Sequence, residues 1–568
     1  MAAQKTDTLT CDVLVIGSGA GGLSAAITAK KAGLDVLVIE KEDYFGGTTA
    51  LSGGFLWVPG NHHARDFGIS DTKEAARTYL QGETGNSYRA EMTEAFLEEG
   101  PKMLEFFERE TSEVRFLSSP QFPDYHPTAP GGVAGGRSVL AAPFDGTKLG
   151  KEFQRLRPPL RTITFVGMMF NSGNEVKHFF NATKSLTSAI YVAKRLTGHM
   201  KELMLYRRGT RLTSGNALAA RLAKSAFDLG IPIRTSTKAL SLITADGKVT
   251  GAELSTPAGR QVVTVRRGVV MAAGGFPQDP ARHAKMFPHG RKGERHVSPA
   301  PEGNTGDGLR MLEAVGATID DTLPNAAAWI PVSRVPLGKG KIGVFPHLID
   351  RYKPGVIAVN RRGQRFVNES NSYHDVGVGM IETSRDEKEI AAWMICDHRA
   401  LRKYGMGFAK PFPMPTSIYT GSGYLLKGKT LAELAKVAGI DPAGLEATVK
   451  RYNDNARRGV DPDFQRGENV YNRYLGDPDA PNACIAPLDQ GPWYAIRLHL
   501  GDLGTYAGIR TDARARVLDG EGQPIGGLYA VGNDMASLMG GNYPGAGITL
   551  GPIMTFGYIA GRDLAANA

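Results

Sequence analysis

The chain has 568 residues, of which 42% are hydrophobic and 22% are charged, and its formal net charge is +10. This composition is typical of a globular protein with a large core, and the length predicts about two to four domains. The three cysteines are widely spaced and form no CxxC or CxxCH pattern, which excludes a disulfide framework and covalently attached haem. No metal site is expected.

The N-terminal residues lack the basic and apolar pattern of a secretory signal. No apolar stretch reaches about 18 residues, so a transmembrane helix is not expected. The sequence therefore predicts a cytoplasmic protein.

Residues 11–42 contain the clearest motif. The apolar run DVLVIG is typical of a parallel strand covered on both faces, and a GxGxxG pattern begins at its last glycine. A helical pattern and a second strand, DVLVIE, follow, and this strand ends at Glu40. The glycines permit a tight turn, approach of a pyrophosphate and close helix packing, while the carboxylate can accept hydrogen bonds from ribose hydroxyls. The dinucleotide contacts predicted here are Gly17, Gly19, Ala20, Gly22, Glu40 and Lys41.

A second loop rich in Gly and Thr, FGGTTALSGG at 45–54, follows shortly after Glu40. Its N–H groups and hydroxyls suit a pyrophosphate and a flavin edge, which favours FAD over NAD. Later strands ending in small residues, at 268–275 and 526–533, are expected at the same carboxyl edge of the sheet, and residue 239 is expected near the adenine. The predicted contacts in these segments are Gly47, Thr48, Thr49, Ser52, Gly53, Ala239, Ala273, Gly274, Gly532 and Asn533.

Residues 148–211 carry 13 Lys or Arg against three Glu, a surplus equal to that of the whole chain. Apolar residues alternate with these cations. Two interpretations stay open: a solvated helical face, or attachment to an anionic membrane surface, to which each basic residue contributes about 1 kcal/mol. The second would place the protein at the inner face of the cell membrane. No nucleic-acid reader motif is present, so nucleic acid is not expected as a partner.

The sequence GGNYPGAGITLG, at 540–551, precedes an apolar run that predicts a C-terminal helix. A flavin enzyme that oxidises a carbon–carbon bond beside a ketone must stabilise an enolate, and this requires hydrogen-bond donors aimed at the carbonyl oxygen. The Tyr543 hydroxyl and the Gly547 N–H can supply two, since we expect the helix to begin at Gly547. Ile548 and Leu550 are expected to contact the flavin.

These motifs, in this order, resemble the FAD-dependent fumarate reductase/succinate dehydrogenase flavoprotein superfamily. Within it, GGTTALSGG, RGQRFVNES, GDLGT and MGGNYPGAGITLGPIMTFGYIAG resemble the 3-ketosteroid Δ1-dehydrogenases. The resemblance implies an α/β fold with a discontinuous Rossmann-like FAD-binding domain at 1–290 and 496–568 and an inserted mixed α/β catalytic domain at 291–495. It also implies non-covalent FAD, because Gly47 and Thr48 stand where covalently flavinylated members have a histidine.

The resemblance assigns catalytic roles to four residues. Tyr543 and Gly547 would bind the carbon-3 keto oxygen of a steroid, Tyr373 would be the base, and Tyr125 would stabilise the phenolate of that base. A phenol with an unperturbed pKa of about 10 is a poor base in water, so this stabilisation is needed.

Four further residues leave questions open. His374 and His126, each next to one of these tyrosines, compete for the role of base on pKa grounds. Tyr506 departs from the Lys-Gly-Gly that often follows GDLGT in the family, and this bulky phenol would reshape the steroid pocket. Tyr474 is expected at the rim of the pocket or in the core.

The expected reaction is 1,2-dehydrogenation of a 3-ketosteroid, with hydride transfer from carbon 1 to FAD and reoxidation by a quinone or another electron acceptor. The nearest alternative is 4-dehydrogenation of 5α-reduced 3-ketosteroids. A fumarate- or urocanate-type reductase is disfavoured, because such enzymes clamp a carboxylate with arginines and none lies within GGNYPGAGITLG. A non-catalytic flavin-binding subunit is the alternative from another class.

Overall fold

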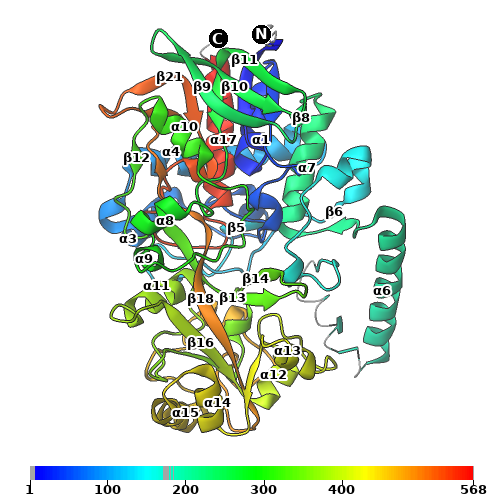
Figure 1. The fold of residues 1–568 in the computed structure, drawn as a ribbon, viewed down its shortest axis with the longest axis vertical. Helices are drawn as coiled ribbons and strands as arrows, with labels where there is room; N and C mark the ends of the chain where they lie inside the picture. The colour runs from blue at the N-terminus through cyan, green and yellow to red at the C-terminus, as the bar shows by residue number, and fades with distance from the viewer. Residues whose placement is uncertain (1–6, 171–174, 176–177, 180, 183–184, 567–568) are drawn as a thin grey trace.

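The computed structural model describes residues 7–170, 175, 178, 179, 181, 182 and 185–566. Two large sheets organise the molecule, one toward each end of its long axis (Figure 1). β1 (Asp7–Ile16) and α17 (Leu550–Ala566), from the two ends of the chain, both belong to the end that holds the first sheet. The first and last parts of the sequence are therefore brought together by the fold.

The first sheet has eight strands, of which five run parallel in the order β21, β11, β1, β2 and β8. β9 and β10 extend it by antiparallel pairing through β11, and β20 pairs with β21. Residues 13–16 of β1 are at most 6% exposed, as in a strand covered on both faces. The remaining strand bounds are β2 Val36–Ile39, β8 Ile233–Arg234, β9 Lys238–Ala245, β10 Lys248–Thr256, β11 Gly259–Met271, β20 Arg516–Leu518 and β21 Pro524–Ala530.

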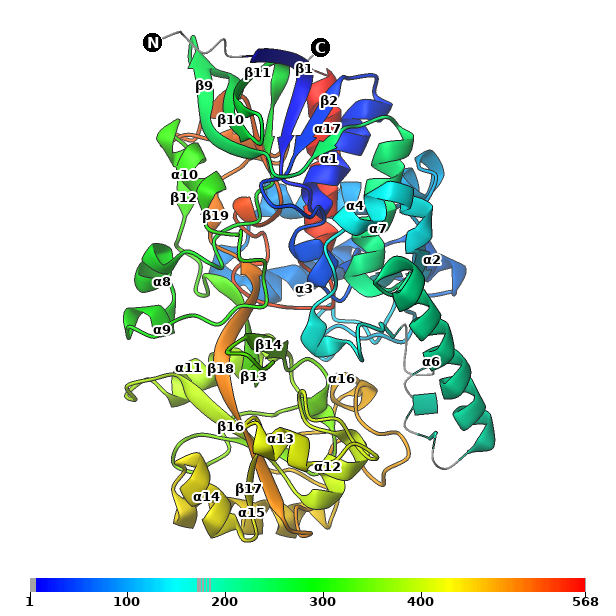
Figure 2. The same cartoon turned by 45° about the vertical axis from the view of Figure 1, so that its right-hand side comes forward.

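Helix α1 (Ala20–Lys31) packs along α17 beside this sheet (Figure 2). Glycines make the close approach possible: a Cβ at Gly557 would lie 2.5 Å from the carbonyl oxygen of Gly21, and one at Gly561 would lie 2.7 Å from the Cβ of Thr28. The C-terminal helix thus fixes the position of the helix that follows the first strand. α7 (Ser214–Asp228) also packs on α1, and α4 (Ala90–Glu110) packs on α17.

The second sheet has six antiparallel strands and lies toward the other end of the molecule. Its strands are β13 Ala327–Pro336, β14 Ile342–Pro346, β15 Val356–Val359, β16 Ala391–Cys396, β17 Leu426–Gly428 and β18 Trp493–Thr505. α11 (Tyr373–Thr383) contacts β13, while α14 (Leu431–Ala438) and α15 (Pro442–Ala456) pack on each other. The expected architecture, a Rossmann-like part with an inserted mixed α/β part, is confirmed.

β18 crosses residue 496, where the sequence analysis ends the inserted domain. It pairs with β16 and β17 from Trp493 onward and still pairs with β13 at Thr505. We therefore propose a boundary just beyond β18.

A three-stranded sheet lies between the N-terminal and C-terminal segments. It consists of β3 (Phe55–Trp57), β5 (Ser138–Ala141) and β4 (Phe116–Ser118). The Trp57 N–H donates to the Gly547 carbonyl at 3.0 Å, and the Ser138 hydroxyl donates to the Ala546 carbonyl at 2.9 Å. This sheet therefore supports the GGNYPGAGITLG segment from behind.

The remaining elements are shorter or connect these layers. The helices are α2 His62–Asp66, α3 Lys73–Thr84, α6 Leu186–Tyr206, α8 Pro280–Met286, α9 Pro288–Arg291, α10 Asp307–Ala314, α12 His398–Tyr404, α13 Ser417–Gly421 and α16 Val470–Tyr474. The strands are β6 Phe144–Asp145, β7 Arg211–Leu212, β12 Ile319–Asp320 and β19 Gly508–Ile509.

The basic segment 148–211 has two structurally different parts. Its first part contributes the buried side chains of Leu149, Phe153 and Leu156 to the core. α6 instead stands out from the body at the side of the molecule (Figures 1 and 2). Among the described residues, no helix is long and apolar enough to cross a membrane.

Candidate active site

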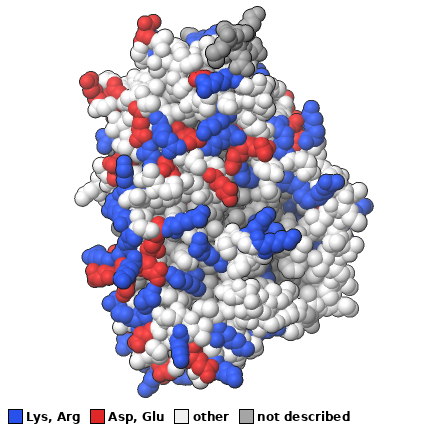
Figure 3. All heavy atoms as spheres, in the orientation of Figure 1, with Lys and Arg blue, Asp and Glu red and all other residues white. Residues whose placement is uncertain are grey.

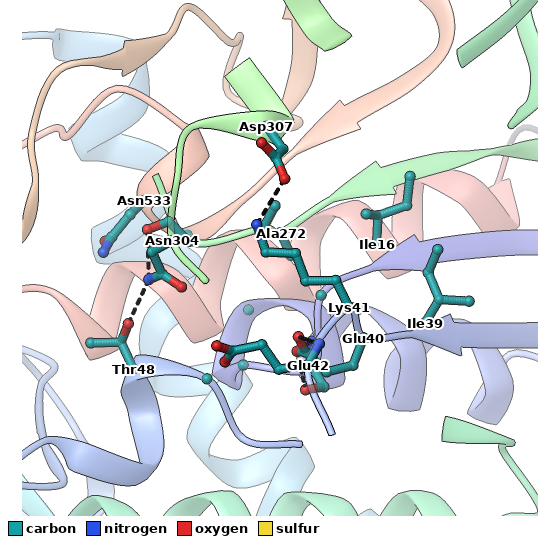
Figure 4. A pocket seen from close by; sticks show the side chains of 18 of the residues that line it. Ile16, Ile39, Glu40, Lys41, Glu42, Thr48, Ala272, Asn304, Asp307 and Asn533 are labelled. Carbon is teal, nitrogen blue, oxygen red and sulfur yellow. Dashed lines mark hydrogen bonds and ion pairs between the residues drawn. The ribbon is translucent and has the colours of Figure 1, made fainter. Parts of the chain in front are cut away.

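A cleft lies at the carboxyl ends of the parallel strands. Figure 4 shows Ile16 and Ile39, the last residues of β1 and β2, beside the charged side chains of the cleft. In parallel sheets this edge is where nucleotides bind. Thirteen predicted cofactor contacts line it: Gly17, Gly19, Ala20, Glu40, Lys41, Gly47, Thr48, Thr49, Ala239, Ala273, Gly274, Gly532 and Asn533.

The GxGxxG glycines are required by close backbone approach. Gly17 has φ +115°, and a Cβ there would lie 2.1 Å from the Ala272 carbonyl oxygen. A Cβ at Gly22 would lie 2.1 Å from the Gly17 carbonyl oxygen, which explains the tight packing of α1 on β1. The first turn of α1 carries no acidic side chain, so its positive end faces the cleft uncompensated. This arrangement suits a phosphate group.

Glu40 lies at the end of β2, where a ribose is expected. Its Oε2 accepts hydrogen bonds from the hydroxyl of Ser18 at 2.6 Å and from the Ser18 N–H at 3.3 Å. Burial raises the pKa of Glu40, and the Ser18 hydrogen bonds oppose this effect. Lys41 pairs with Asp307 at 2.8 Å, which fixes the lysine at the rim of the cleft (Figure 4).

Two of the cleft residues that the sequence analysis did not predict come from a distant segment of the chain. Asn304 donates through Nδ2 to the Thr48 hydroxyl at 2.9 Å and to the Gly274 carbonyl at 3.1 Å, and Asp307 binds Lys41 (Figure 4). Both come from the stretch EGNTGDG, whose glycines were the only local signal. This stretch lies in the segment assigned to the inserted domain and reaches the nucleotide cleft only through the fold.

The other predicted cofactor contacts lie outside the lining of this cleft: Gly22, Ser52, Gly53, Ile548 and Leu550. Gly22 packs behind it, and the Ser52 hydroxyl donates to the Thr49 carbonyl at 2.8 Å. The residue of α17 that lines the cleft is Ile553. The cleft's glycine-rich turn and the start of α1 fit the phosphates of FAD, and the Glu40 carboxylate fits a ribose.

A cluster of tyrosines from distant parts of the chain lies near the GGNYPGAGITLG segment. The Tyr125 hydroxyl donates to the Tyr373 oxygen at 3.2 Å. The Tyr543 ring stacks on Tyr125, with centroids 5.6 Å apart, and meets Tyr373 edge-on at 4.8 Å. All three side chains are at most 6% exposed. The structure thus brings together the three tyrosines singled out in the sequence.

Burial dominates the acid–base properties of this cluster. It raises the pKa of Tyr373 and of Tyr125 well above the ordinary value of a phenol, and it also raises the pKa of Tyr543. All three are therefore neutral hydrogen-bond donors at neutral pH in the protein alone. Proton transfer to Tyr373 requires stabilisation of its phenolate, which the Tyr125 hydroxyl is placed to provide.

Further tyrosines surround these three. Tyr471 packs on Tyr125 with ring centroids 4.5 Å apart, and its hydroxyl lies 2.5 Å from that of Tyr352. Tyr506 is 1% exposed and donates to the Asn542 carbonyl at 2.8 Å, next to Tyr543 in the chain. Sequence reasoning missed Tyr471 and Tyr352, because neither belongs to a recognisable motif.

Tyr474 lies at the periphery. It is 41% exposed, and its ring packs on Phe122 at 4.8 Å. Of the two expectations for this residue, a rim position agrees better with its exposure than a place in the core.

Gly547 lies in a turn, and α17 begins three residues later, at Leu550. The expectation that the helix starts at Gly547 is therefore wrong, although the Gly551 N–H already bonds to the Gly547 carbonyl at 2.9 Å. Gly547 has φ +95°, and a Cβ there would lie 2.5 Å from the carbonyl carbon of Phe55. Its N–H donates to no described protein acceptor, so this donor is available for a ligand.

The two competing histidines are both held by other groups. Burial alone would lower the pKa of His126, but hydrogen bonds to Asp375 at 3.0 Å and Glu83 at 2.9 Å raise it to about 10. His126 is thus protonated at neutral pH and is a poor base. Burial lowers the pKa of His374 to about 4, and its Nδ1 accepts the Trp329 N–H at 3.0 Å.

The segment from Tyr543 to Ile553 connects the two halves of the candidate site. Tyr543 belongs to the tyrosine cluster, and Ile553 lines the nucleotide cleft. Gly545 is pressed against the indole of Trp57, where a Cβ would lie 2.6 Å from the ring. A side chain at Gly545 would therefore not fit between this backbone and Trp57.

Comparison with known proteins agrees with this geometry. A family model described as an FAD binding domain matches residues 12–550. The chain is 43% identical to 4-oxocyclohex-2-ene-1-carboxylate 5-dehydrogenase of Sinomonas cyclohexanicum, over 99% of this chain and 95% of the relative. It is 37% identical to 3-oxosteroid 1-dehydrogenase of Mycobacterium tuberculosis, over 98% of each chain.

A solved structure shows the same architecture. The 3-ketosteroid Δ1-dehydrogenase of Sterolibacterium denitrificans, in complex with 1,4-androstadiene-3,17-dione, superposes with a TM-score of 0.90 at 36% identity, over 98% of this chain and 100% of that one. The cofactor of the present chain is FAD. The chain belongs to the FAD binding domain family, as an FAD-dependent dehydrogenase of the steroid dehydrogenase and fumarate reductase flavoprotein group.

Proposed function

We propose that the chain dehydrogenates a 3-ketosteroid between carbons 1 and 2. The observation that carries this proposal is the contact of Tyr125, Tyr373 and Tyr543 beside a turn whose Gly547 N–H has no protein acceptor among the described residues. Two donors for a ketone and a phenol supported by a second phenol are the groups that such a reaction needs.

The glycine-rich turn at 17–22, Glu40 and the loop that contains Asn304 would hold FAD. When bound, FAD would accept the hydride from the substrate. It is expected to be non-covalent, so acid precipitation should release it from the protein completely. The chain's own residues act on the substrate. Tyr543 and the Gly547 N–H hold the keto oxygen, and both strengthen their hydrogen bonds as negative charge develops on it. The Tyr373 phenolate, stabilised by the hydrogen bond from the Tyr125 hydroxyl, takes the proton from carbon 2 and becomes a neutral phenol.

The burial of the cluster contributes to this chemistry. In a site without water, hydrogen bonds to a developing enolate are stronger than in solution, because no solvent competes for them. The same burial destabilises the Tyr373 phenolate. Binding of the keto oxygen makes the carbon-2 proton more acidic, so this binding must precede the proton transfer.

A second candidate substrate is a 4-oxocyclohexane or 4-oxocyclohexene carboxylate, the class named for the relative at 43% identity. Two features favour it. Tyr506 fills space beside Tyr543 with a fully buried phenol. Arg351 is 2% exposed, and three backbone carbonyls accept hydrogen bonds from its Nε and Nη1. Its Nη2 has no partner among the described residues, which leaves one donor beside Tyr352 for a carboxylate.

Anaerobic mixing of the oxidised enzyme with defined substrates tests these assignments. Loss of the flavin absorbance with 4-androstene-3,17-dione supports the proposed reaction, and loss with only a 5α-saturated 3-ketosteroid supports 4-dehydrogenation. Loss with only 4-oxocyclohexanecarboxylate supports the second candidate. If none of the three reduces the flavin, the proposal is rejected in favour of a reductase or a non-catalytic subunit.

We further propose that α6 attaches the protein to an anionic membrane surface, where a quinone could serve as electron acceptor. Leu186, Ile190, Met200 and Met204 on this helix are 55–78% exposed. In Figure 3, the part of the surface at the right of the view, where Figure 1 places α6, consists mostly of uncharged residues. Solvent-exposed apolar side chains on a projecting helix favour insertion into the interface of a bilayer, with nearby Lys and Arg binding the headgroups.

A further inference from the structure

Two adjacent histidines converge on one carboxylate at a site remote in sequence from the catalytic motifs. The Nε2 of His62 lies 2.8 Å from Glu108 Oε2, and the Nε2 of His63 lies 3.1 Å from the same oxygen. The two imidazole rings have centroids only 4.2 Å apart. The ligand atoms of all three residues lie within 4.8 Å of one another.

The surrounding structure holds these groups in place. Asn61 caps α2, accepting the Ala64 N–H at 2.9 Å, and its amide donates to the Val58 and Gly136 carbonyls. The Phe116 N–H donates to Glu108 Oε1 at 3.0 Å, which orients the carboxylate from β4. These contacts fix the start of α2 and orient the Glu108 carboxylate toward it, with β4 in contact with both.

The nearest cation of α2 does not compete for Glu108. Arg65 pairs with Glu105 at 3.3 Å, on the next turn of α4. The Glu108 carboxylate is thus left to the two imidazoles.

We propose that His62, His63 and Glu108 bind a divalent transition-metal ion of the Zn²⁺ type. Two imidazole nitrogens and one carboxylate oxygen are ligands that Zn²⁺ accepts, whereas Mg²⁺ and Ca²⁺ prefer oxygen ligands alone. The three side chains are 14–24% exposed, so an ion can enter and keep a water molecule as its fourth ligand. The separations of 2.8 and 3.1 Å need little adjustment to accept an ion at about 2.0–2.2 Å from each ligand.

The ion would have a structural role in this position. α2 begins five residues after Trp57, whose indole is packed against Gly545 in the keto-binding segment. Cross-linking α2 to α4 would therefore stiffen the support of that segment without contacting the substrate. Zn²⁺ undergoes no redox change, so it would not exchange electrons with the flavin.

The sequence analysis expected no metal site, and the reason is clear from the spacing. Adjacent histidines on a helix normally point in directions about 100° apart, and the third ligand lies 45 residues after His63. The three come together only in the fold, where α2 contacts β4 and the Phe116 N–H of β4 donates to Glu108 of α4.

The test uses the FAD-loaded full-length protein and a matched variant. Glu108→Gln keeps the size of the side chain and its hydrogen-bond acceptor but removes the anionic ligand. After dialysis against EDTA, titration with ZnCl₂ followed by calorimetry should show one strong site in the wild type. In Glu108→Gln the affinity should fall by more than about 100-fold, a larger loss than the roughly 10–100-fold that is usual for residues that only support a ligand.

Thermal unfolding provides a second readout. ZnCl₂ should raise the Tm of the wild type and leave that of Glu108→Gln almost unchanged, and MgCl₂ should raise neither. His63→Gln should behave like Glu108→Gln. Absence of a Zn²⁺ site in the wild type, or equal affinity in the wild type and Glu108→Gln, would show that the cluster is only a hydrogen-bonded group and would overturn the proposal.

Discussion

The Tyr125 hydroxyl donates a hydrogen bond of 3.2 Å to the oxygen of Tyr373, although 248 positions separate the two residues in the chain. Tyr125 comes from a loop that is anchored by its own N–H to the Pro544 carbonyl at 2.9 Å, and Tyr373 is the first residue of α11. The pair therefore joins the nucleotide-binding part to the inserted part at the point where the ketone is proposed to bind.

Replacement of Tyr373 by Phe should lower the rate of flavin reduction by about 10²–10⁴-fold, because it removes the proposed base. The ring contacts with Tyr125 and Tyr543 remain, so the variant should fold and keep FAD. Stopped-flow absorbance measures the rate, and the ratio of flavin to protein absorbance measures cofactor content. Tyr404→Phe, which changes a tyrosine bonded to Asp477 in the inserted part, is the control. Full activity of Tyr373→Phe rejects the assignment.

Tyr125→Phe should have a smaller effect on the rate and a distinctive effect on its pH dependence. The Tyr125 O–H stabilises the Tyr373 phenolate, so its removal raises the pKa of Tyr373 further. A base must be deprotonated to act, and kcat/KM therefore rises with pH up to this pKa. The rising limb of the profile should move to higher pH in the variant. An unchanged profile would mean that Tyr125 only fills space.

Tyr543→Phe should lower kcat by about 10²–10³-fold, the loss typical of removing one donor from a developing oxyanion. Substrate binding should weaken much less, because the ring still packs on Tyr125 and Tyr373. Single-turnover kinetics at saturating ketone separate the two effects. A change in KM alone would contradict a role in the transition state.

The nucleotide cleft could be predicted from the sequence because its signals are local. The run from Gly17 to Glu40 specifies strand, turn, helix and strand within one continuous segment, and thirteen predicted contacts line the cleft. Asn304 was missed because it reaches the cleft from a segment 256 residues after Thr48, its hydrogen-bond partner, through packing that no local pattern encodes. The remaining predicted contacts are not among the residues that line the cleft.

The tyrosine cluster was accessible only through the resemblance. Nothing in the neighbourhood of Tyr125 or Tyr373 indicates that they meet, and Tyr471 and Tyr352 joined the cluster without any motif. The helix start was placed three residues early because Gly547 adopts φ +95°, a conformation that continues the turn before regular helix begins. The basic segment was treated as one unit, yet its first part contributes buried side chains to the core and α6 carries exposed apolar ones.

The His126 interaction should make stability depend on pH. Its pKa is raised to about 10 in the folded protein by Asp375 and Glu83, above the ordinary value of about 6.5. The resulting stabilisation is fully present below pH about 6.5 and is lost as the pH rises through about 10. His126→Gln should therefore lower the free energy of unfolding more at pH about 6 than at pH about 10, as measured by urea denaturation. An equal loss at both pH values would show that the charge of His126 contributes nothing.

The membrane proposal for α6 is testable by changing only its exposed face. Deleting residues 148–211 would remove the buried Leu149 and Phe153 and unfold the protein, so substitutions are required. Leu186 and Met204 are 78% and 75% exposed, and burial of two such side chains in a bilayer interface contributes about 1.5–3 kcal/mol each at most. Leu186→Glu combined with Met204→Glu should therefore lower the partition onto vesicles by more than about tenfold.

Sedimentation with vesicles of phosphatidylglycerol and phosphatidylcholine measures this partition. Binding of the wild type should weaken as the salt concentration rises, because the basic side chains of the segment contribute through a screened attraction. The matched control, Ile342→Glu with Val437→Glu, places two carboxylates on exposed apolar positions elsewhere and should bind like the wild type. The α6 variant should retain flavin reduction in solution, since α6 contributes no residue to the cleft or the tyrosine cluster. Failure of the wild type to bind anionic vesicles at low salt, or equal losses in both double variants, would exclude α6 as the attachment surface.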